Sequence, residues 1–177
     1  MKKLYRSALM LALCFAFLVP ARAAVRDAVT AIPTNHAIVL SNSTVQPDAH
    51  LVHPTVYLIE GSNYCKLRDL AMLLNGSERQ FAVGYDSAAK TVSITRGKAY
   101  KAVGGELSGA AVESVSAAIS DHTIVIDGTP ATLEAFLIDG VNYFKLRDLG
   151  KALDFYVGFD SETKMVFLSG AKPYVDE

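Results

Sequence analysis

Residues 61–70 read GSNYCKLRDL, and residues 140–149 read GVNYFKLRDL, 79 positions later. The similarity continues downstream, where FAVGYDS at 81–87 aligns with FYVGFDS at 155–161 once five extra residues in the first copy are allowed. Upstream, IVL at 38–40 corresponds to IVI at 124–126. A match of this length does not arise by chance, so the sequence predicts a duplicated unit.

Each copy has the pattern of strand, strand, helix, strand, strand. Leucines recur at i, i+3 and i+7, which predicts a short helix with one apolar face in each copy; these are Leu67, Leu70 and Leu74, then Leu146, Leu149 and Leu153. The last two strands are expected to form a hairpin, with Asp86 or Asp160 opening its turn through side-chain bonds to backbone amides. We therefore expect an α+β fold of two tandem ββαββ modules, each an antiparallel sheet packed on one short helix.

The expected modules cover residues 35–100 and 121–174. Between them, residues 101–120 are rich in Gly, Ala and Ser, a composition typical of a flexible linker. Part of this segment, residues 111–119, could instead form a short helix.

The N-terminus has the features of a secretory signal. Lys2, Lys3 and Arg6 precede an apolar stretch at 8–19, and Ala21-Arg22-Ala23 forms a small-x-small cleavage motif. We expect 1–23 to be a signal peptide cleaved after Ala23, leaving a secreted, extracellular chain, associated with the cell envelope or free, with no stable membrane span. The alternatives are an uncleaved anchor and lipidation at Cys14.

Charge and cysteine content limit the partners and the source of stability. Of 17 basic and 18 acidic residues, four basic ones lie in the expected signal, so the mature chain has 13 against 18, near −5. That balance argues against a nucleic-acid partner. Cys65 is then the single cysteine, so no internal disulfide is expected and a hydrophobic core must stabilise the fold.

The repeated motif, followed by Val-Gly-Phe-Asp and a Lys-x-Val strand, resembles the copper amine oxidase N-terminal domain-like family, also called stalk domains. The resemblance covers most of the mature chain, twice. It implies a non-catalytic protein of the Gram-positive cell surface, with a sheet wrapped on one helix and no copper chemistry. Two departures are Cys65 in place of the aromatic at Phe144, and a longer loop at 42–54.

Several motifs contain residue types that occur in reactive or metal-binding sites. Asn63-Tyr64 and Asn142-Tyr143 partly match the context of an oxidase quinone, but no acid follows and no His-x-His pair accompanies them, so packing is expected for both tyrosines. His50-x-x-His53, with His36 and Asp48 nearby in sequence, could bind a metal, yet a solvated loop is favoured. Cys65 could be a nucleophile, but Phe144 at the same position of the second copy indicates an apolar site. We expect no catalytic residues, metal or cofactor.

One polar cluster is duplicated: Lys66, Arg68 and Asp69, then Lys145, Arg147 and Asp148. It could contact a ligand such as an anionic wall polymer, since arginine binds such groups in a bidentate manner. The favoured interpretation is architectural, with the aspartates in the first helical turn and the arginines paired to acids such as Asp86 and Asp160.

These observations favour a non-catalytic spacer, scaffold or envelope-binding protein whose partner is a cell-wall polymer or another surface protein. One alternative is a small secreted hydrolase with carboxylates such as Glu106 and Glu113 between the modules. Another is a protein that self-associates through edge strands. The oligomeric state is left open by the sequence.

Overall fold

The structure, a computed structural model, describes residues 28–42, 49–108 and 113–176. The expected signal peptide at 1–23, and Asp48, lie outside these residues. Within the described part, neither helix is long and apolar enough to cross a membrane.

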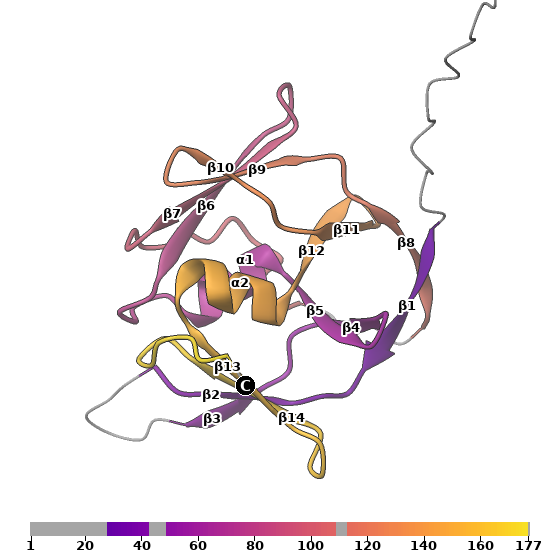
Figure 1. Ribbon diagram of the computed structural model, residues 1–177, viewed down its shortest axis with the longest axis vertical. Helices are drawn as coiled ribbons and strands as arrows, with labels where there is room; N and C mark the ends of the chain where they lie inside the picture. The colour runs from indigo at the N-terminus through magenta and orange to yellow at the C-terminus, as the bar shows by residue number, and fades with distance from the viewer. Residues whose placement is uncertain (1–27, 43–48, 109–112, 177) are drawn as a thin grey trace, which may run out of the picture.

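The described residues form fourteen strands and two short helices, arranged alike in the two repeats (Figure 1). The elements of the first repeat are β1 Val29–Thr34, β2 Ile38–Leu40, β3 His50–Val52, β4 Val56–Ile59, β5 Ser62–Lys66, α1 Leu67–Leu73, β6 Phe81–Asp86 and β7 Thr91–Arg96. Those of the second are β8 Val115–Ile119, β9 Thr123–Ile126, β10 Thr129–Ala131, β11 Ala135–Ile138, β12 Val141–Lys145, α2 Leu146–Leu153, β13 Tyr156–Asp160 and β14 Met165–Ser169.

Six strands, three from each repeat, close into a barrel in the order β1-β4-β5-β12-β11-β8. Three strands of one repeat alone would leave two edges of unpaired backbone groups, which favour pairing with another chain. Antiparallel pairing of β5 with β12 and of β1 with β8 removes both edges. The two repeats therefore complete each other's sheet.

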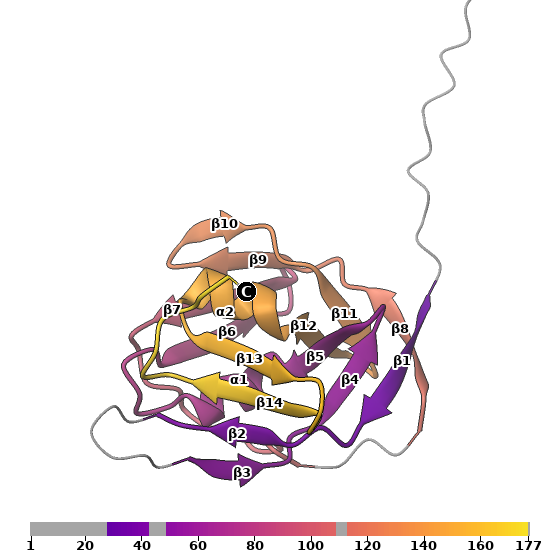
Figure 2. The same ribbon diagram turned by 60° about the horizontal axis from the view of Figure 1, so that its bottom comes forward.

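The two remaining sheets also mix the repeats. The β6-β7 hairpin of the first repeat pairs with β9 and β10 of the second, and the β13-β14 hairpin of the second pairs with β2 and β3 of the first. Both contacts between repeats are parallel, β7 to β9 and β14 to β2. Figure 2 shows both helices enclosed between these sheets and the barrel.

The expectation of two ββαββ modules, each a sheet on its own helix, is therefore wrong. The chain is mostly β, with a closed six-stranded barrel that belongs to both repeats. The physical reason is that the strands of one repeat alone would leave backbone N–H and C=O groups unpaired at their edges. The predicted strands do form, but strands of each repeat pair with strands of the other.

The register places the repeats about a pseudo-two-fold axis. Cys65 and Phe144, the same position in the two repeats, are direct partners at the centre of the β5-β12 ladder. Thr30 and Ser116 are likewise partners in the β1-β8 ladder, and they are separated by the same 86 positions as Ile38 and Ile124. A residue that pairs with its own equivalent lies on a two-fold axis, so the axis passes through both pairs.

The core has two parts. Inside the barrel, Tyr57 packs edge-on against Tyr143 and Tyr64 against Phe136, each at 5.3 Å between ring centroids. These two contacts are equivalent under the pseudo-two-fold. Outside the barrel, the second cluster joins both helices, both four-stranded sheets and the outer barrel face.

The local predictions are confirmed within this different topology. Both helices form where the leucine spacing placed them, and all six leucines are buried. The carboxylate of Asp86 accepts bonds from Ala88 N–H and Ala89 N–H, and that of Asp160 from Glu162 N–H and Thr163 N–H.

The segment assigned to the linker contributes to the barrel. Val115–Ile119 forms β8 between β1 and β11, so the alternative of a helix is wrong over these residues. Their small and β-branched side chains suit the closed barrel wall, where Ala117 is fully buried.

Candidate functional site

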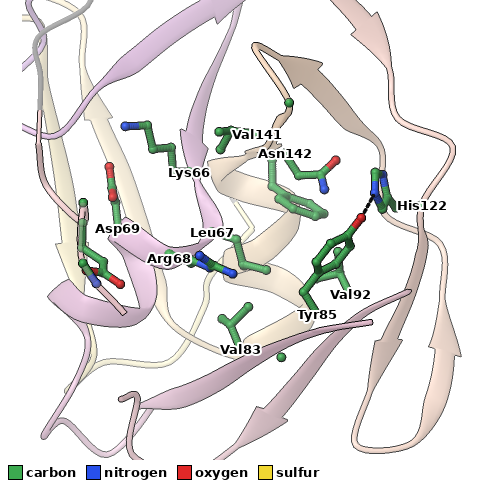
Figure 3. Close-up of a pocket in the computed structure, with 16 residues that line it drawn as sticks. Lys66, Leu67, Arg68, Asp69, Val83, Tyr85, Val92, His122, Val141 and Asn142 are labelled. Atoms are coloured by element: carbon green, nitrogen blue, oxygen red, sulfur yellow. Dashed lines mark hydrogen bonds between the residues drawn. The ribbon is translucent and has the colours of Figure 1, made fainter. Parts of the chain in front are cut away.

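A pocket of about 410 Å³ lies between the repeats, beside the start of α1 (Figure 3). We call it pocket 1. The first repeat contributes Lys66, Arg68, Asp69 and Tyr85 to its lining, and the second repeat contributes His122 and Asn142. Residues 104–106 of the connecting segment form a further part of the wall. Because the hairpins are exchanged, neither repeat alone could form this pocket.

A second pocket, of about 270 Å³, is the pseudo-two-fold equivalent of the first. We call it pocket 2. Much of its lining is equivalent to that of pocket 1: His36 corresponds to His122, Asn63 to Asn142, Lys145 to Lys66, Arg147 to Arg68, and Phe159 to Tyr85. The protein therefore carries two copies of one site.

A chain of hydrogen bonds fixes the far wall of pocket 1. Ser120 donates its hydroxyl proton to Asn142 Oδ1 at 2.6 Å, so Ser120 Oγ accepts from His122 Nδ1 at 2.8 Å. The other ring nitrogen, Nε2, then accepts the proton of Tyr85 Oη at 2.9 Å. Every donor in this chain has an acceptor, which holds the Tyr85 ring in one orientation.

In pocket 2 the equivalent histidine and asparagine are in direct contact, without a serine between them. His36 Nδ1 contacts Asn63 Oδ1 directly at 3.2 Å. The ring of His36 lies 5.5 Å from that of Phe159, and the ring of His122 lies 5.4 Å from that of Tyr85. The histidine, the asparagine and the aromatic ring are thus duplicated as a unit.

The duplicated cations lie at these pockets. Lys66 and Arg68 line pocket 1, and Lys145 and Arg147 line pocket 2. In Figure 3, Arg68 lies between Asp69 on one side of pocket 1 and Tyr85 with His122 on the other. Lys66 Nζ donates to the carbonyl of Ser108 at 3.3 Å.

Both acids named as candidate partners of the arginines serve the hairpin turns. The carboxylates of Asp86 and Asp160 accept backbone N–H groups there. The predicted pair between Arg68 and Asp86 does not form, and no described acid makes an ion pair with Arg68. The predicted pairing of Arg68 with an acid is therefore absent among the described residues.

The two aspartates of the motif differ in environment. Both lie in the first turn of their helices, as predicted. Asp69 is 1% exposed and lines pocket 1, whereas Asp148 is half-buried and is not part of the pocket 2 lining. Asp69 Oδ1 accepts Leu107 N–H at 3.0 Å, while Oδ2 has no hydrogen-bond partner among the described residues. Burial raises the pKa of this carboxyl.

Glu106 shapes the connecting segment beside pocket 1. Its Oε1 accepts Tyr100 Oη–H at 2.6 Å and Val103 N–H at 2.9 Å, and its Oε2 accepts Gly104 N–H at 2.9 Å. These bonds, that from Tyr100 first, lower the pKa of Glu106 to about 2. Glu113, its expected partner in a hydrolase, is exposed and does not line pocket 1.

Glu106→Gln should reduce stability in a pH-dependent way. Because the folded-state pKa of Glu106 is lowered, its contribution is complete above the ordinary carboxyl pKa and is lost as the pH falls through about 2. Urea unfolding of the parent and the variant should differ at pH 7 and converge toward pH 2. Glu113→Gln removes the same charge from an exposed site and serves as the control. A Glu106→Gln difference that does not change with pH would contradict the assigned bonds.

Several other sequence candidates lie away from the pockets. His50 and His53 are exposed, and the described residues contain no group of three His, Cys, Asp or Glu side chains placed to bind a metal. Tyr64 and Tyr143 are buried in the barrel, in agreement with the packing prediction. Cys65 is fully buried, and burial raises the pKa of its thiol.

The sequence analysis did not assign the histidine and asparagine of each pocket to a common site: His36, Asn63 and Asn142 were considered only for metal or quinone chemistry. A signal was present, because His36 and His122 are 86 positions apart, like 38–40 and 124–126, and Asn63 and Asn142 share the 79-residue offset of the main motif. What the sequence does not show is that a histidine from one repeat faces a Lys-x-Arg segment from the other.

No protein-family model, curated protein or solved structure matches this chain.

Proposed function

We propose that this protein is a non-catalytic, secreted or cell-surface module that binds an anionic polymer of the cell envelope through pockets 1 and 2. The observation that carries the proposal is the placement of the repeated Lys-Leu-Arg segment at two equivalent pockets. An architectural cation has no need of such a pocket, whereas a ligand-binding cation does. The resemblance to the copper amine oxidase N-terminal domain-like family agrees with this role and stays a prediction.

The chemistry of pocket 1 suits an anionic group. The guanidinium of Arg68 has no acidic partner among the described residues and offers paired donors that match phosphate or carboxylate oxygens. Val83, Val92 and Phe144 add an apolar lining that lowers the local dielectric and strengthens such bonds. The pocket therefore offers a guanidinium without an acidic partner among the described residues, although Asp69 and Glu106 also line it.

Two equivalent sites on one chain favour a repetitive ligand. Once one pocket holds a polymer segment, the other meets further segments at a raised effective concentration, so weak sites together give firm attachment. A polymer with regularly spaced anionic groups meets this requirement better than a small metabolite does.

The decisive experiment measures binding of poly(glycerol phosphate), as a model anionic polymer, by calorimetry. Arg68→Gln and Arg147→Gln should each weaken binding by about 10–100-fold, because a hydrogen bond to a charged group contributes about 1.5–3 kcal/mol. Lys98→Gln removes one positive charge at an exposed residue outside both pockets and should leave binding nearly unchanged. Equal binding by all three variants, or none by the parent, would contradict the proposal and leave a spacer or self-associating role.

One observation favours a second candidate function, hydrolysis of a glycan. Asp69 and Glu106 both line pocket 1, and their pKa values move in opposite directions, as in a general acid and its ionised partner. Against this role, both oxygens of Glu106 already accept hydrogen bonds from the chain. Release of reducing ends from an envelope glycan by the parent, abolished in Asp69→Asn, would select this function.

A further inference from the structure

We infer that pocket 1 takes a ligand unit in which an ammonium group stands beside the anionic group, and that Asp69 selects the ammonium. This inference rests on the proposed function and adds a specificity to it. Pocket 2, which lacks a buried carboxylate in its lining, is inferred to bind the anionic group alone.

The unused oxygen of Asp69 is the first observation. The side chain is 1% exposed, and Oδ2 is the sole buried side-chain oxygen or nitrogen without a hydrogen-bond partner among the described residues. Leaving such an atom unsatisfied costs about 1–3 kcal/mol. Unsatisfied buried groups in native proteins call for an explanation, and a ligand donor supplies one here because Asp69 lines the pocket.

The surroundings of Asp69 favour a cationic donor over a hydroxyl. Burial has the largest effect on Asp69 and raises the pKa of its carboxyl, whereas Lys66 lowers that pKa by charge attraction and Glu106, which lines the same pocket, raises it by a smaller effect. A hydroxyl would satisfy Oδ2 but would do little for a carboxylate charge that burial has removed from water. An ammonium would satisfy Oδ2 and stabilise that charge through a charge-assisted hydrogen bond, while the anionic part of the ligand meets Arg68.

Lys66 does not already fill this role. Its ammonium donates to the carbonyl of Ser108, and it makes no hydrogen bond to Asp69 among the described residues. Figure 3 shows Lys66 and Asp69 on one side of the pocket, with Arg68 between them and the wall formed by Tyr85 and His122. The pocket thus presents an acceptor and a guanidinium side by side, as a zwitterionic unit requires.

The difference between the pockets has a local origin. In pocket 1, Leu107 N–H holds Asp69 Oδ1, and residues 104–106 form part of the wall. The described lining of pocket 2 contains Lys145 and Arg147 but neither Asp148 nor a counterpart of 104–106. Pocket 2 is therefore an internal control for anion binding without the carboxylate.

The test compares 2-aminoethyl phosphate with ethyl phosphate, which differ by the ammonium group. Both are titrated into the ¹⁵N-labelled protein, and amide shifts are followed separately for the residues of each pocket. Pocket 1 should prefer 2-aminoethyl phosphate by about tenfold, the worth of one charge-assisted hydrogen bond, and pocket 2 should show no preference. This comparison needs no substitution, so it cannot be confounded by misfolding.

Variants then assign the preference to one side chain. Asp69→Asn keeps an acceptor for Leu107 N–H but removes the charge, and it should abolish the preference of pocket 1 while ethyl phosphate still binds. Asp148→Asn, the same change in the other repeat, should leave the preference intact. Equal affinity of pocket 1 for both probes, or a preference that survives Asp69→Asn, would overturn this inference but not the proposed function. Failure of both probes to shift either pocket would overturn both.

Discussion

Phe144→Ala is expected to lower the free energy of unfolding by about 3–5 kcal/mol, the usual range for removing a buried phenylalanine ring. The ring is 1% exposed and belongs to the core cluster that joins the barrel, both helices and both flanking sheets. It lies on the pseudo-two-fold axis opposite the smaller Cys65. Because three layers meet there, the cavity cannot be closed by a shift of one neighbour, and the loss is a large share of the ~5–15 kcal/mol typical of domains.

Urea denaturation followed by circular dichroism measures this loss. The midpoint should fall while the slope of the transition stays the same. Phe167→Ala is the matched control, because Phe167 lies in β14 and is 37% exposed. Equal losses for the two substitutions would show that position 144 is not at the centre of the core.

The sequence predicted the local structure of this protein well. Leucine spacing located both helices, and the Asp86 and Asp160 turns form with the side-chain bonds expected of them. These features depend on residues close in sequence, so a periodic pattern is sufficient to find them.

The exchange of strands could not be predicted because the repeats are so similar. Ile38 and Ile124 belong to equivalent short apolar strands, and either could pair with the last hairpin of its own repeat or with that of the other. What separates the two arrangements is the pairing between the repeats, β7 with β9 and β14 with β2, which no local pattern contains.

The site was only partly predicted, because it too depends on contacts between the two repeats. The duplicated Lys-x-Arg segment was recognised, but its arginines were expected to pair with acids of their own hairpins. His122 faces that segment from the other repeat, so its relevance to Lys66 and Arg68 follows from the exchange. The difference between Asp69 and Asp148 was also beyond prediction, since it depends on contacts with residues 104–107.

Two alternative cysteine pairs test the exchange directly. In the structure Thr91 of β7 is the direct partner of Thr123 of β9 in a parallel ladder between the repeats. Ala37 is the equivalent of Thr123 in the first repeat, and it would replace Thr123 beside Thr91 if each repeat folded on its own. Neighbouring strands lie about 5 Å apart, within the Cα separation that a disulfide spans.

Mild oxidation of the chain from residue 24, followed by mass spectrometry, distinguishes the two topologies. Buried Cys65 is present in both variants and is not expected to react. We predict an intramolecular disulfide in Thr91→Cys/Thr123→Cys and none in Ala37→Cys/Thr91→Cys. A disulfide in the second pair, with none in the first, would show that the repeats keep their own hairpins, and the exchanged four-stranded sheets and both pockets between the repeats would then be wrong.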